Sequence, residues 1–261
     1  MKEIINYLFL LLMVLPEAIY ALNQATGKDL RPLFEKYGFD AYDQGERNTC
    51  SVFAIAGLLE FEYAHTQKKA ESLSVEYLNW ASNKITGELV DGSYFSDALT
   101  ALDKYGICSD ELFPYYILNY NNKVAPSQTA IKEAKKRRGA NIYWIKEWDP
   151  TIGMTEAQTA QVKLQILNEH PVAIGFRWPK KEDRYRRMEN GIMVVPPKEG
   201  VYDGHSVIIV GFKDDPAVAG GGYFIFKNSY GTGFGEEGYG KMPYRYVSRY
   251  ANDGVAIHLK K

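Results

Sequence analysis

Four polar side chains in distant parts of the chain are of the kinds that are needed for acyl transfer to a thiol. Cys50 offers a nucleophile at the point where a polar stretch, residues 43–49, gives way to an apolar one. His205 offers an imidazole that can take or give a proton, and Gln44 and Asn228 offer side-chain amides that can donate and accept hydrogen bonds. A cysteine with a distant histidine and amide is a complete set for nucleophilic catalysis. The sequence therefore predicts a thiol active site.

The apolar residues that follow Cys50 predict a helix that begins at this cysteine. The backbone N–H groups at a helix N-terminus are unpaired, and together with the helix dipole they favour a thiolate over a thiol. The alternative is an inert, buried cysteine, which is the commoner fate of a lone cysteine. The position directly after Asn48 and Thr49, rather than in mid-helix, favours the reactive interpretation.

Each of the other side chains has a role that its place in the chain suggests. His205 precedes the apolar strand residues 207–210, which would hold its imidazole at the edge of a sheet. Asn228 follows a predicted strand, where its carbonyl oxygen can fix one imidazole tautomer, and Tyr230 can cover that hydrogen bond. Gln44 can donate to a developing oxyanion, with an ordinary surface glutamine as the alternative. The remaining histidines are interpreted as structural or solvated residues: His65, His170 and His258.

Hydrophobic periodicity and capping signals predict the elements that position these residues. A helix runs from Cys50 to about Tyr63, and apolar residues on all its faces indicate that it is buried. Further helices are predicted at residues 74–83, 95–105 and 155–167. Strands are predicted at residues 171–176, 192–195, 206–212, 223–227, 238–242 and 255–259. Residues 29–47 are expected to be extended, and residues 213–222 to form a surface loop.

These elements predict an α+β fold of two lobes. A helical N-terminal lobe spans about residues 45–150, and a β-rich, barrel-like C-terminal lobe spans about residues 151–261. The predicted nucleophile belongs to the first lobe, and the predicted imidazole and its amide partner belong to the second. The contact between the lobes is therefore the expected active-site cleft.

The amino-acid composition of the chain limits the classes of molecule that it is expected to bind. The chain has 261 residues, of which 46% are hydrophobic and 24% are charged, as in a soluble protein with a substantial core. The formal net charge of -1 argues against binding to nucleic acid or to an anionic membrane. Basic clusters at residues 132–138 and 180–187 are interpreted as solvated faces, with an acidic partner as the alternative. Cys108 is interpreted as a packing residue, so no disulfide is expected.

The N-terminus has the layout of a secretory signal peptide. Lys2 precedes an apolar run, residues 7–15, that is well short of the roughly 20 residues needed to span a bilayer. Small residues follow at Ala18 and Ala21, and cleavage after Ala21 would give a domain of residues 22–261. An uncleaved anchor or a buried first helix is the alternative. We expect an exported protein that is monomeric and has no stable membrane association once residues 1–21 are removed.

Three motifs in combination resemble the papain-like cysteine peptidase family. They are the stretch from Gln44 to Cys50, the histidine strand Gly204–Gly211, and residues 228–239. The last segment reads Asn-Ser-Tyr-Gly-Thr-Gly-Phe-Gly-Glu-Glu-Gly-Tyr and is similar to the family's Asn-Ser-Trp-Gly-x-x-Trp-Gly-x-x-Gly-Tyr. The resemblance covers the chain from about Asp29 to its end.

The resemblance implies a role for each residue. Cys50 would be the nucleophile, His205 the acid and base, and Asn228 the residue that orients the imidazole. Gln44 would donate to the oxyanion beside the Cys50 N–H, and Tyr230 would shield the imidazole. The residues implied to contact substrate are Gly92, Ser93, Gly204 and Ser206. The substrate would be a protein or peptide, cleaved through a thioester without a metal or other cofactor.

Several positions depart from the family pattern. Ser51 stands where the family usually has Trp, and Arg47 stands where it usually has a disulfide cysteine. Ser93 replaces the second glycine of the segment whose backbone, by the resemblance, would pair with substrate. Only residues 22–43 separate the predicted cut from Gln44, so we expect the compact, disulfide-poor branch that lacks a large prosegment.

Two other functions remain open at this stage. The changes at Ser51 and Ser93 would fit a catalytically silent peptide-binding protein on the same scaffold. The same site could also pass the acyl group to another acceptor, or hydrolyse an amide that is not part of a protein. Retention of all four chemistry-bearing residues favours the peptidase.

Overall fold

The structure is a computed structural model that describes residues 25–68, 70–116, 124–180 and 188–259. The predicted signal peptide and most of the basic cluster at 180–187 lie outside these residues. Within the described ranges, no helix combines the length and apolar character needed to cross a bilayer.

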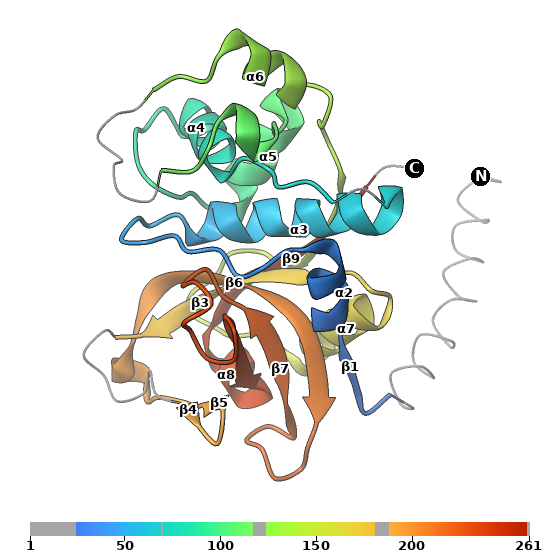
Figure 1. The fold of residues 1–261 in the computed structure, drawn as a ribbon. Coiled ribbons are helices and arrows are strands. Elements are labelled where there is room, and N and C mark those ends of the chain that lie inside the picture. The colour runs from blue at the N-terminus through green and yellow to red at the C-terminus, as the bar shows by residue number, and fades with distance from the viewer. Residues whose placement is uncertain (1–24, 69, 117–123, 181–187, 260–261) are drawn as a thin grey trace, which may run out of the picture.

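The helical lobe is built on α3, Cys50–Gln67, which lies across the middle of the molecule (Figure 1). Three helices lie on one side of it: α4 (Val75–Thr86), α5 (Phe95–Tyr105) and α6 (Gln128–Ala134). As predicted, α3 is buried nearly all round, because helices cover one face and the sheet covers the other. It begins at Cys50, as predicted, and extends one turn further than expected.

The predicted capping signals act as expected. The Ser74 hydroxyl accepts a hydrogen bond from the Tyr77 N–H at the start of α4, and Gly106 follows the last residue of α5. Thr155 and Gln158 form a reciprocal capping box before α7 (Glu156–Leu167). These local bonds fix where the helices begin and end.

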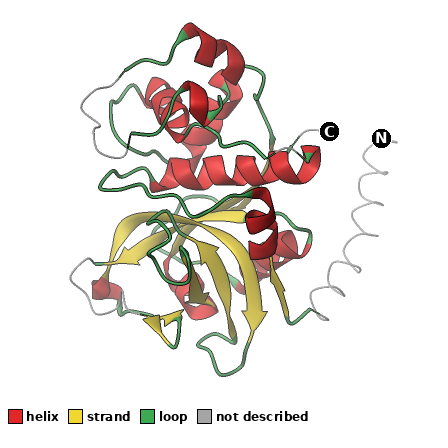
Figure 2. Cartoon of the chain, in the orientation of Figure 1, coloured by secondary structure: helices red, strands yellow, loops and turns green. Residues whose placement is uncertain are grey.

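The β-rich lobe contains one curled sheet of nine strands among the described residues, in the order β2-β9-β3-β6-β7-β8-β5-β4, with β1 paired to β6 (Figure 2). The strand bounds are β1 Gly27–Asp29, β2 Asn141–Lys146, β3 Val172–Pro179, β4 Met188–Glu189, β5 Ile192–Met193, β6 Val201–Asp214, β7 Gly222–Lys227, β8 Tyr239–Pro243 and β9 Ala251–His258. All pairs are antiparallel except β5 with β8. The predicted α+β, two-lobe fold is confirmed, with β2 joined to the sheet through β9.

One expectation about the start of the domain was wrong. Residues 31–37 were expected to be extended, but Arg31–Tyr37 forms the short helix α2, with Pro32 in its first turn and Gly38 after its end. Seven residues are too few to show a clear helical period. Two short 3-10 turns, Asp110–Leu112 and Lys198–Gly200, and the helix α8 (Tyr244–Tyr250) complete the described elements.

The two lobes share a continuous core where α3 crosses the sheet. Gly57 of α3 lies against Ile208 of β6, and a Cβ at position 57 would be 2.5 Å from the Ile208 Cδ1 atom. The small residue therefore lets the helix approach the strand closely. This approach brings the N-terminus of α3, with Cys50, beside the middle of β6, with His205.

Candidate active site

Cys50 occupies the first position of α3 and is largely buried. Its thiol points across the lobe interface and lies 3.8 Å from the carbonyl oxygen of Gly204. The backbone N–H and hydroxyl of Ser206 also hydrogen-bond to the sulfur. The predicted nucleophile therefore lies directly against the strand that carries His205.

The charge state of the sulfur differs from the one that the sequence favoured. Burial raises the pKa of the Cys50 thiol, and this effect outweighs the N–H and O–H donors of Ser206, Ser51 and Cys50 itself, which lower it. The helix N-terminus alone therefore does not ionise the sulfur. A thiolate at this position would need a cation beside it.

His205 lies within β6 rather than at its start, beside a local irregularity of the sheet. In the pairing with β3, His205 faces Phe176 and Asp203 faces Arg177, so Gly204 is an extra residue with φ of +109°. Such a bulge changes the direction of the next side chain, and glycine adopts this φ without strain. The bulge therefore helps to set the direction of the buried imidazole, one residue after the carbonyl group that the thiol contacts.

Two aromatic rings enclose the imidazole of His205. The Tyr230 ring is stacked on it, with centroids 4.6 Å apart, and the Trp178 ring lies at 4.6 Å in a tilted orientation. The hydroxyl of Tyr230 is 3.3 Å from His205 Nδ1. Trp178 was not selected from the sequence, because nothing local to residue 178 shows that β3 pairs with the histidine strand.

Asn228 fixes the tautomer of the imidazole. Its Oδ1 lies 2.7 Å from His205 Nε2 and also accepts the Ser229 backbone N–H at 2.9 Å. Because a carbonyl oxygen can only accept, Nε2 must carry a hydrogen and donate it. Nδ1 is then the nitrogen that can accept a proton.

Gln44 is buried and its amide is oriented by two contacts. Its Oε1 accepts the Ser229 hydroxyl at 2.6 Å, and its Nε2 donates to the Arg47 carbonyl at 2.6 Å. An amide nitrogen carries two hydrogens, so one remains for an oxyanion. The Gln44 backbone N–H also donates to the Ser229 carbonyl at 2.9 Å. Ser229, which the sequence placed in a motif without a role, therefore joins the two lobes behind the site.

A pocket of about 680 Å³ opens beside the imidazole, between the lobes. It contains all four residues that the sequence named for substrate contact: Gly92, Ser93, Gly204 and Ser206. Two of their backbone donors are already engaged, since the Gly92 N–H donates to Asn79 Oδ1 at 2.9 Å and the Ser93 N–H donates to the Ser51 hydroxyl at 3.1 Å. The carbonyl groups of these two residues are therefore better placed than their N–H groups to pair with a peptide.

Asp253, a buried carboxyl group on β9, also lines the pocket and was not anticipated from the sequence. Its Oδ1 accepts the Gly175 N–H at 3.0 Å, and a Cβ at Gly175 would lie 2.3 Å from this oxygen. Burial raises the pKa of Asp253 to about 6, with a smaller opposing effect from Gly175 and Lys146. The pocket therefore contains an acid that is ionised at neutral pH and protonated in mild acid.

A second cysteine, and a buried carboxyl group and ammonium group, lie outside the site. Cys108 is fully buried in the helical lobe, as predicted, and burial raises the pKa of its thiol to about 12. Glu60 on α3 and Lys227 on β7 are buried behind the site, where desolvation raises the pKa of the carboxyl group and lowers that of the ammonium group. The Cys50 and Cys108 thiols are both free.

The fold and this constellation define a class, the two-lobed proteins in which a helix-terminal cysteine faces a histidine and an asparagine on a sheet. A sequence model for the papain family cysteine proteases matches residues 33–255. The chain therefore belongs to the papain family of cysteine proteases, as the motifs indicated.

Proteins similar to this chain occur in widely different organisms. The chain is 27% identical over 213 residues to an uncharacterised peptidase C1-like protein, L477, of Acanthamoeba polyphaga mimivirus, covering 79% of this chain and 65% of the relative. It is 27% identical over 202 residues to procathepsin L of Felis catus, covering 77% and 55%. The match thus spans less than two thirds of these relatives. The solved structure of xylellain, a cysteine protease from Xylella fastidiosa, superimposes with a TM-score of 0.75 at 23% identity over 93% of this chain and 89% of that one.

Proposed function

We propose that the protein is a cysteine peptidase that hydrolyses peptide bonds through a thioester intermediate. The observation that carries the proposal is a pair of contacts, one within the β-rich lobe and one across the lobe interface. His205 Nε2 lies 2.7 Å from Asn228 Oδ1, and the Cys50 sulfur lies 3.8 Å from the carbonyl oxygen of Gly204, the residue before that histidine. A nucleophile, a tautomer-fixed base and an orienting amide are the parts that acyl transfer needs.

In the proposed acylation step, the Cys50 sulfur attacks the peptide carbonyl carbon while its proton passes to His205 Nδ1. The carbonyl electron pair moves onto oxygen, where the remaining N–H of Gln44 and the Cys50 backbone N–H would stabilise the negative charge. Collapse of this intermediate breaks the C–N bond, and the imidazolium proton goes to the leaving amine. The product of this step is a thioester on Cys50.

In the proposed deacylation step, His205 Nδ1 takes a proton from water as the water oxygen attacks the thioester carbon. The C–S bond then breaks, the sulfur recovers its proton, and the carboxylic acid leaves. Tyr230 would limit the access of other water to the imidazole, because its ring is stacked on it. No cofactor is needed for either step.

The pocket beside His205 is the proposed site for a substrate side chain. Gly204 and Ser206 border it from the sheet, and Gly92 and Ser93 border it from the helical lobe. A peptide lying along this groove would pass over the Cys50 sulfur. The proposed substrates are therefore proteins or peptides.

Replacement of the nucleophile tests the proposal. Cys50→Ala is expected to lower the rate of peptide-library cleavage at least about 1000-fold, because every other group acts through the sulfur. The melting temperature should change little, and a thiol-directed epoxide should add one equivalent to Cys50 in the wild type. Cys108→Ala is the control and should leave cleavage unchanged. Labelling of Cys108 with Cys50 untouched would contradict the proposal.

A silent peptide-binding protein is the second candidate. It is favoured by the Gly92 and Ser93 N–H groups, whose hydrogen bonds to Asn79 and Ser51 leave fewer donors for a bound peptide. Peptide binding without cleavage or epoxide labelling would select this candidate. A product with the mass of an acyl group joined to an added amine would instead indicate transpeptidation.

We further propose that the protein is exported and acts as a monomer. Residues 1–21 carry the signal-peptide pattern on which this proposal rests. The expected result is a secreted or periplasmic product that begins at Leu22 and elutes as a single chain in size-exclusion chromatography. A full-length product that sediments with membranes would contradict it.

A further inference from the structure

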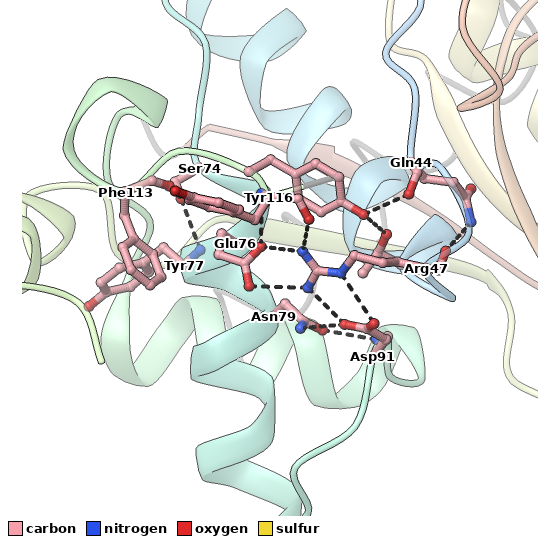
Figure 3. A network of polar contacts seen from close by, with 12 residues as sticks. Gln44, Arg47, Ser74, Glu76, Tyr77, Asn79, Asp91, Phe113 and Tyr116 are labelled. Carbon is pink, nitrogen blue, oxygen red and sulfur yellow. Dashed lines mark hydrogen bonds and ion pairs between the residues drawn. The ribbon is translucent and has the colours of Figure 1, made fainter. Parts of the chain in front are cut away.

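Arg47, in the loop before Cys50, is the centre of the polar network in Figure 3. Its side chain is only 5% exposed. Nη1 and Nη2 donate to the two carboxylate oxygens of Glu76 at 2.6 and 3.1 Å, and Nη2 and Nε donate to those of Asp91 at 2.8 and 3.2 Å. Nη1 also donates to the Tyr116 carbonyl at 2.7 Å. These contacts occupy all five guanidinium N–H groups.

The main chain of Arg47 contacts the proposed oxyanion donor. Its carbonyl oxygen accepts Gln44 Nε2 at 2.6 Å. The Tyr115 ring lies against the guanidinium group, with the carbon Cζ 4.6 Å from the ring centroid, and its hydroxyl donates to the Gln44 carbonyl at 2.9 Å. A displacement of Arg47 would therefore move the Gln44 amide as well.

On its other side, the guanidinium group holds the segment that lines the substrate pocket. Asp91 directly precedes Gly92, and its Oδ1 also accepts Asn79 Nδ2 at 3.2 Å. Asn79 Oδ1 in turn accepts the Gly92 N–H at 2.9 Å. The main chain at Gly92 lies so close to the cysteine loop that a Cβ would be 2.3 Å from the Asn48 carbonyl oxygen. Arg47 therefore connects two segments whose separation matters for a bound peptide.

We propose that Arg47 is a positioning residue, which sets the separation between the Gln44 amide and the backbone of residues 91–93 and so aligns a peptide over Cys50. The inference rests on the proposed function. A planar guanidinium group can bind two carboxylates in fixed directions at once, whereas a lysine ammonium group acts as a point charge. Both cysteines of the described chain are free, so this ionic contact, and not a disulfide, joins the two segments.

Arg137 provides a matched control in the same lobe. Its side chain is 15% exposed and forms ion pairs with Glu133 and Glu71, and its guanidinium group lies near the Tyr63 ring. It thus resembles Arg47 in burial, in its two carboxylate partners and in its aromatic neighbour. It does not line the substrate pocket. Loss of Arg137 should lower stability without moving the groups of the site.

The experiment compares Arg47→Met and Arg47→Lys with Arg137→Met and Arg137→Lys. Two labelling rates at Cys50 are measured by mass spectrometry, one with a peptidyl epoxide, which must lie in the groove, and one with iodoacetamide, which need not. Their ratio reports peptide alignment separately from sulfur reactivity. kcat and KM on a peptide substrate, and melting temperature, are measured on the same preparations.

Arg47→Met is expected to lower kcat/KM and the peptidyl-epoxide rate about 100-fold, the cost of a displacement of about 1 Å, mainly through kcat. The iodoacetamide rate should change less than about 3-fold, and Arg47→Lys should recover less than a tenth of the lost rate. Both Arg137 variants should keep the wild-type rate ratio within about 2-fold even where their melting temperature falls.

An unchanged rate ratio in either Arg47 variant would overturn the proposal, and so would an equal change in Arg137→Met. If Arg47→Met does not fold, Arg47→Lys alone decides, because it retains the positive charge. If the wild type is labelled but does not hydrolyse peptides, the proposed function fails, and the labelling ratio still tests the role of Arg47.

Discussion

Two walls face each other across the groove and are held in different ways. The nucleophile wall comprises residues 44–50 and 91–93, and the imidazole wall comprises residues 204–206 and 228–230. Ion pairs from Arg47 to Glu76 and Asp91 connect the parts of the nucleophile wall. On the imidazole wall, the position of His205 follows from strand register, from a bulge at Gly204 and from packing between aromatic rings.

The difference follows from what each wall is made of. The nucleophile wall consists of loops, which have no ladder of backbone hydrogen bonds to hold them, so charged side chains fix their separation. In the imidazole wall, residues 204–206 belong to the paired strand β6 and residues 228–230 directly follow the paired strand β7, so backbone bonds and buried rings already hold them. We therefore expect the stability that the nucleophile wall gains from its ion pairs to depend on salt. The stability of the imidazole wall should depend instead on buried apolar volume.

The largest expected effect on stability concerns the ring of Trp178 on β3, which packs against the imidazole wall. Trp178 is buried against His205 and Phe226, and Trp178→Ala should lower the free energy of unfolding by about 3–5 kcal/mol through the cavity that it leaves. Urea unfolding in a Cys50→Ala background, at 0.05 and 1 M NaCl, measures this loss and avoids self-digestion. The exposed Ile152→Ala is the control, with a change within about 0.5 kcal/mol. A loss that depends strongly on salt would contradict the distinction between the walls.

A smaller loss of the free energy of unfolding is expected when an ion pair of the nucleophile wall is removed. Asp91→Asn removes one charged partner of Arg47 and should lower the free energy of unfolding by about 2 kcal/mol. Because the Asp91 side chain is 12% exposed, the loss should shrink in 1 M NaCl. The same urea titration applies, with the exposed Asp103→Asn as control. Equal losses at both salt concentrations would show that charge does not distinguish this wall.

Asp253 lines the pocket beside the imidazole wall, and its charge is expected to act on the ligand rather than on the stability of the protein. The pKa of Asp253 is raised to about 6 by burial, so its carboxyl group is charged above pH 6 and neutral below it. The preference for a lysine over a norleucine peptide, as a ratio of kcat/KM values, should therefore rise about 10-fold from pH 5 to pH 7.5. Asp253→Asn should remove this rise. A ratio that does not change with pH in the wild type would exclude this role.

The smallest effect concerns the far end of the same sheet. Burial, and then the neighbouring His170, lower the pKa of His258 from 6.5 to about 4, and the two rings are stacked 3.6 Å apart. The unfolded chain binds this proton more readily, so stability is present above about pH 6.5 and is lost as the pH falls toward 4. The partial exposure of His258 limits the loss to about 1 kcal/mol.

His258→Gln tests this prediction, since glutamine can keep a hydrogen bond to Gln165 without titrating. Urea unfolding at pH 7 and pH 4.5 should show a smaller acid-induced loss in the variant than in the wild type. Glu62 hydrogen-bonds to His170 at 2.7 Å, and the Tyr143 ring lies 4.2 Å from the His258 ring in a tilted orientation, so these groups also face the pair. Identical pH dependence of the two proteins would contradict the assignment.

Much of the fold and the site could be predicted from the sequence, because the signals involved are local. The start of α3 at Cys50, the Ser74 cap and the Thr155 capping box each depend on neighbouring residues. The motifs around His205 and Asn228 likewise lie within short segments. The short helix α2 was missed because seven residues carry too little periodicity.

Other features depend on tertiary neighbours and left no local signal. Trp178 enters the site only because β3 pairs with the histidine strand, and Asp253 only because β9 pairs with β3. The raised pKa of the Cys50 thiol results from burial by the opposite lobe, which a helix N-terminus does not reveal. Arg47 was noted as a departure from the family pattern, but its carboxylate partners lie 29 and 44 residues further along the chain.

Gly92 has a consequence for anyone who wishes to redesign the specificity of this protein. Its φ of +74° and its contact with the Asn48 carbonyl mean that any larger residue would act as a wedge between two main chains. Mutant libraries should therefore leave this position unchanged and vary Tyr94 or Trp148, whose exposed rings meet at the rim of the same pocket. Substitutions at Tyr94 or Trp148 would alter which ligands bind without displacing the main chain at Gly92.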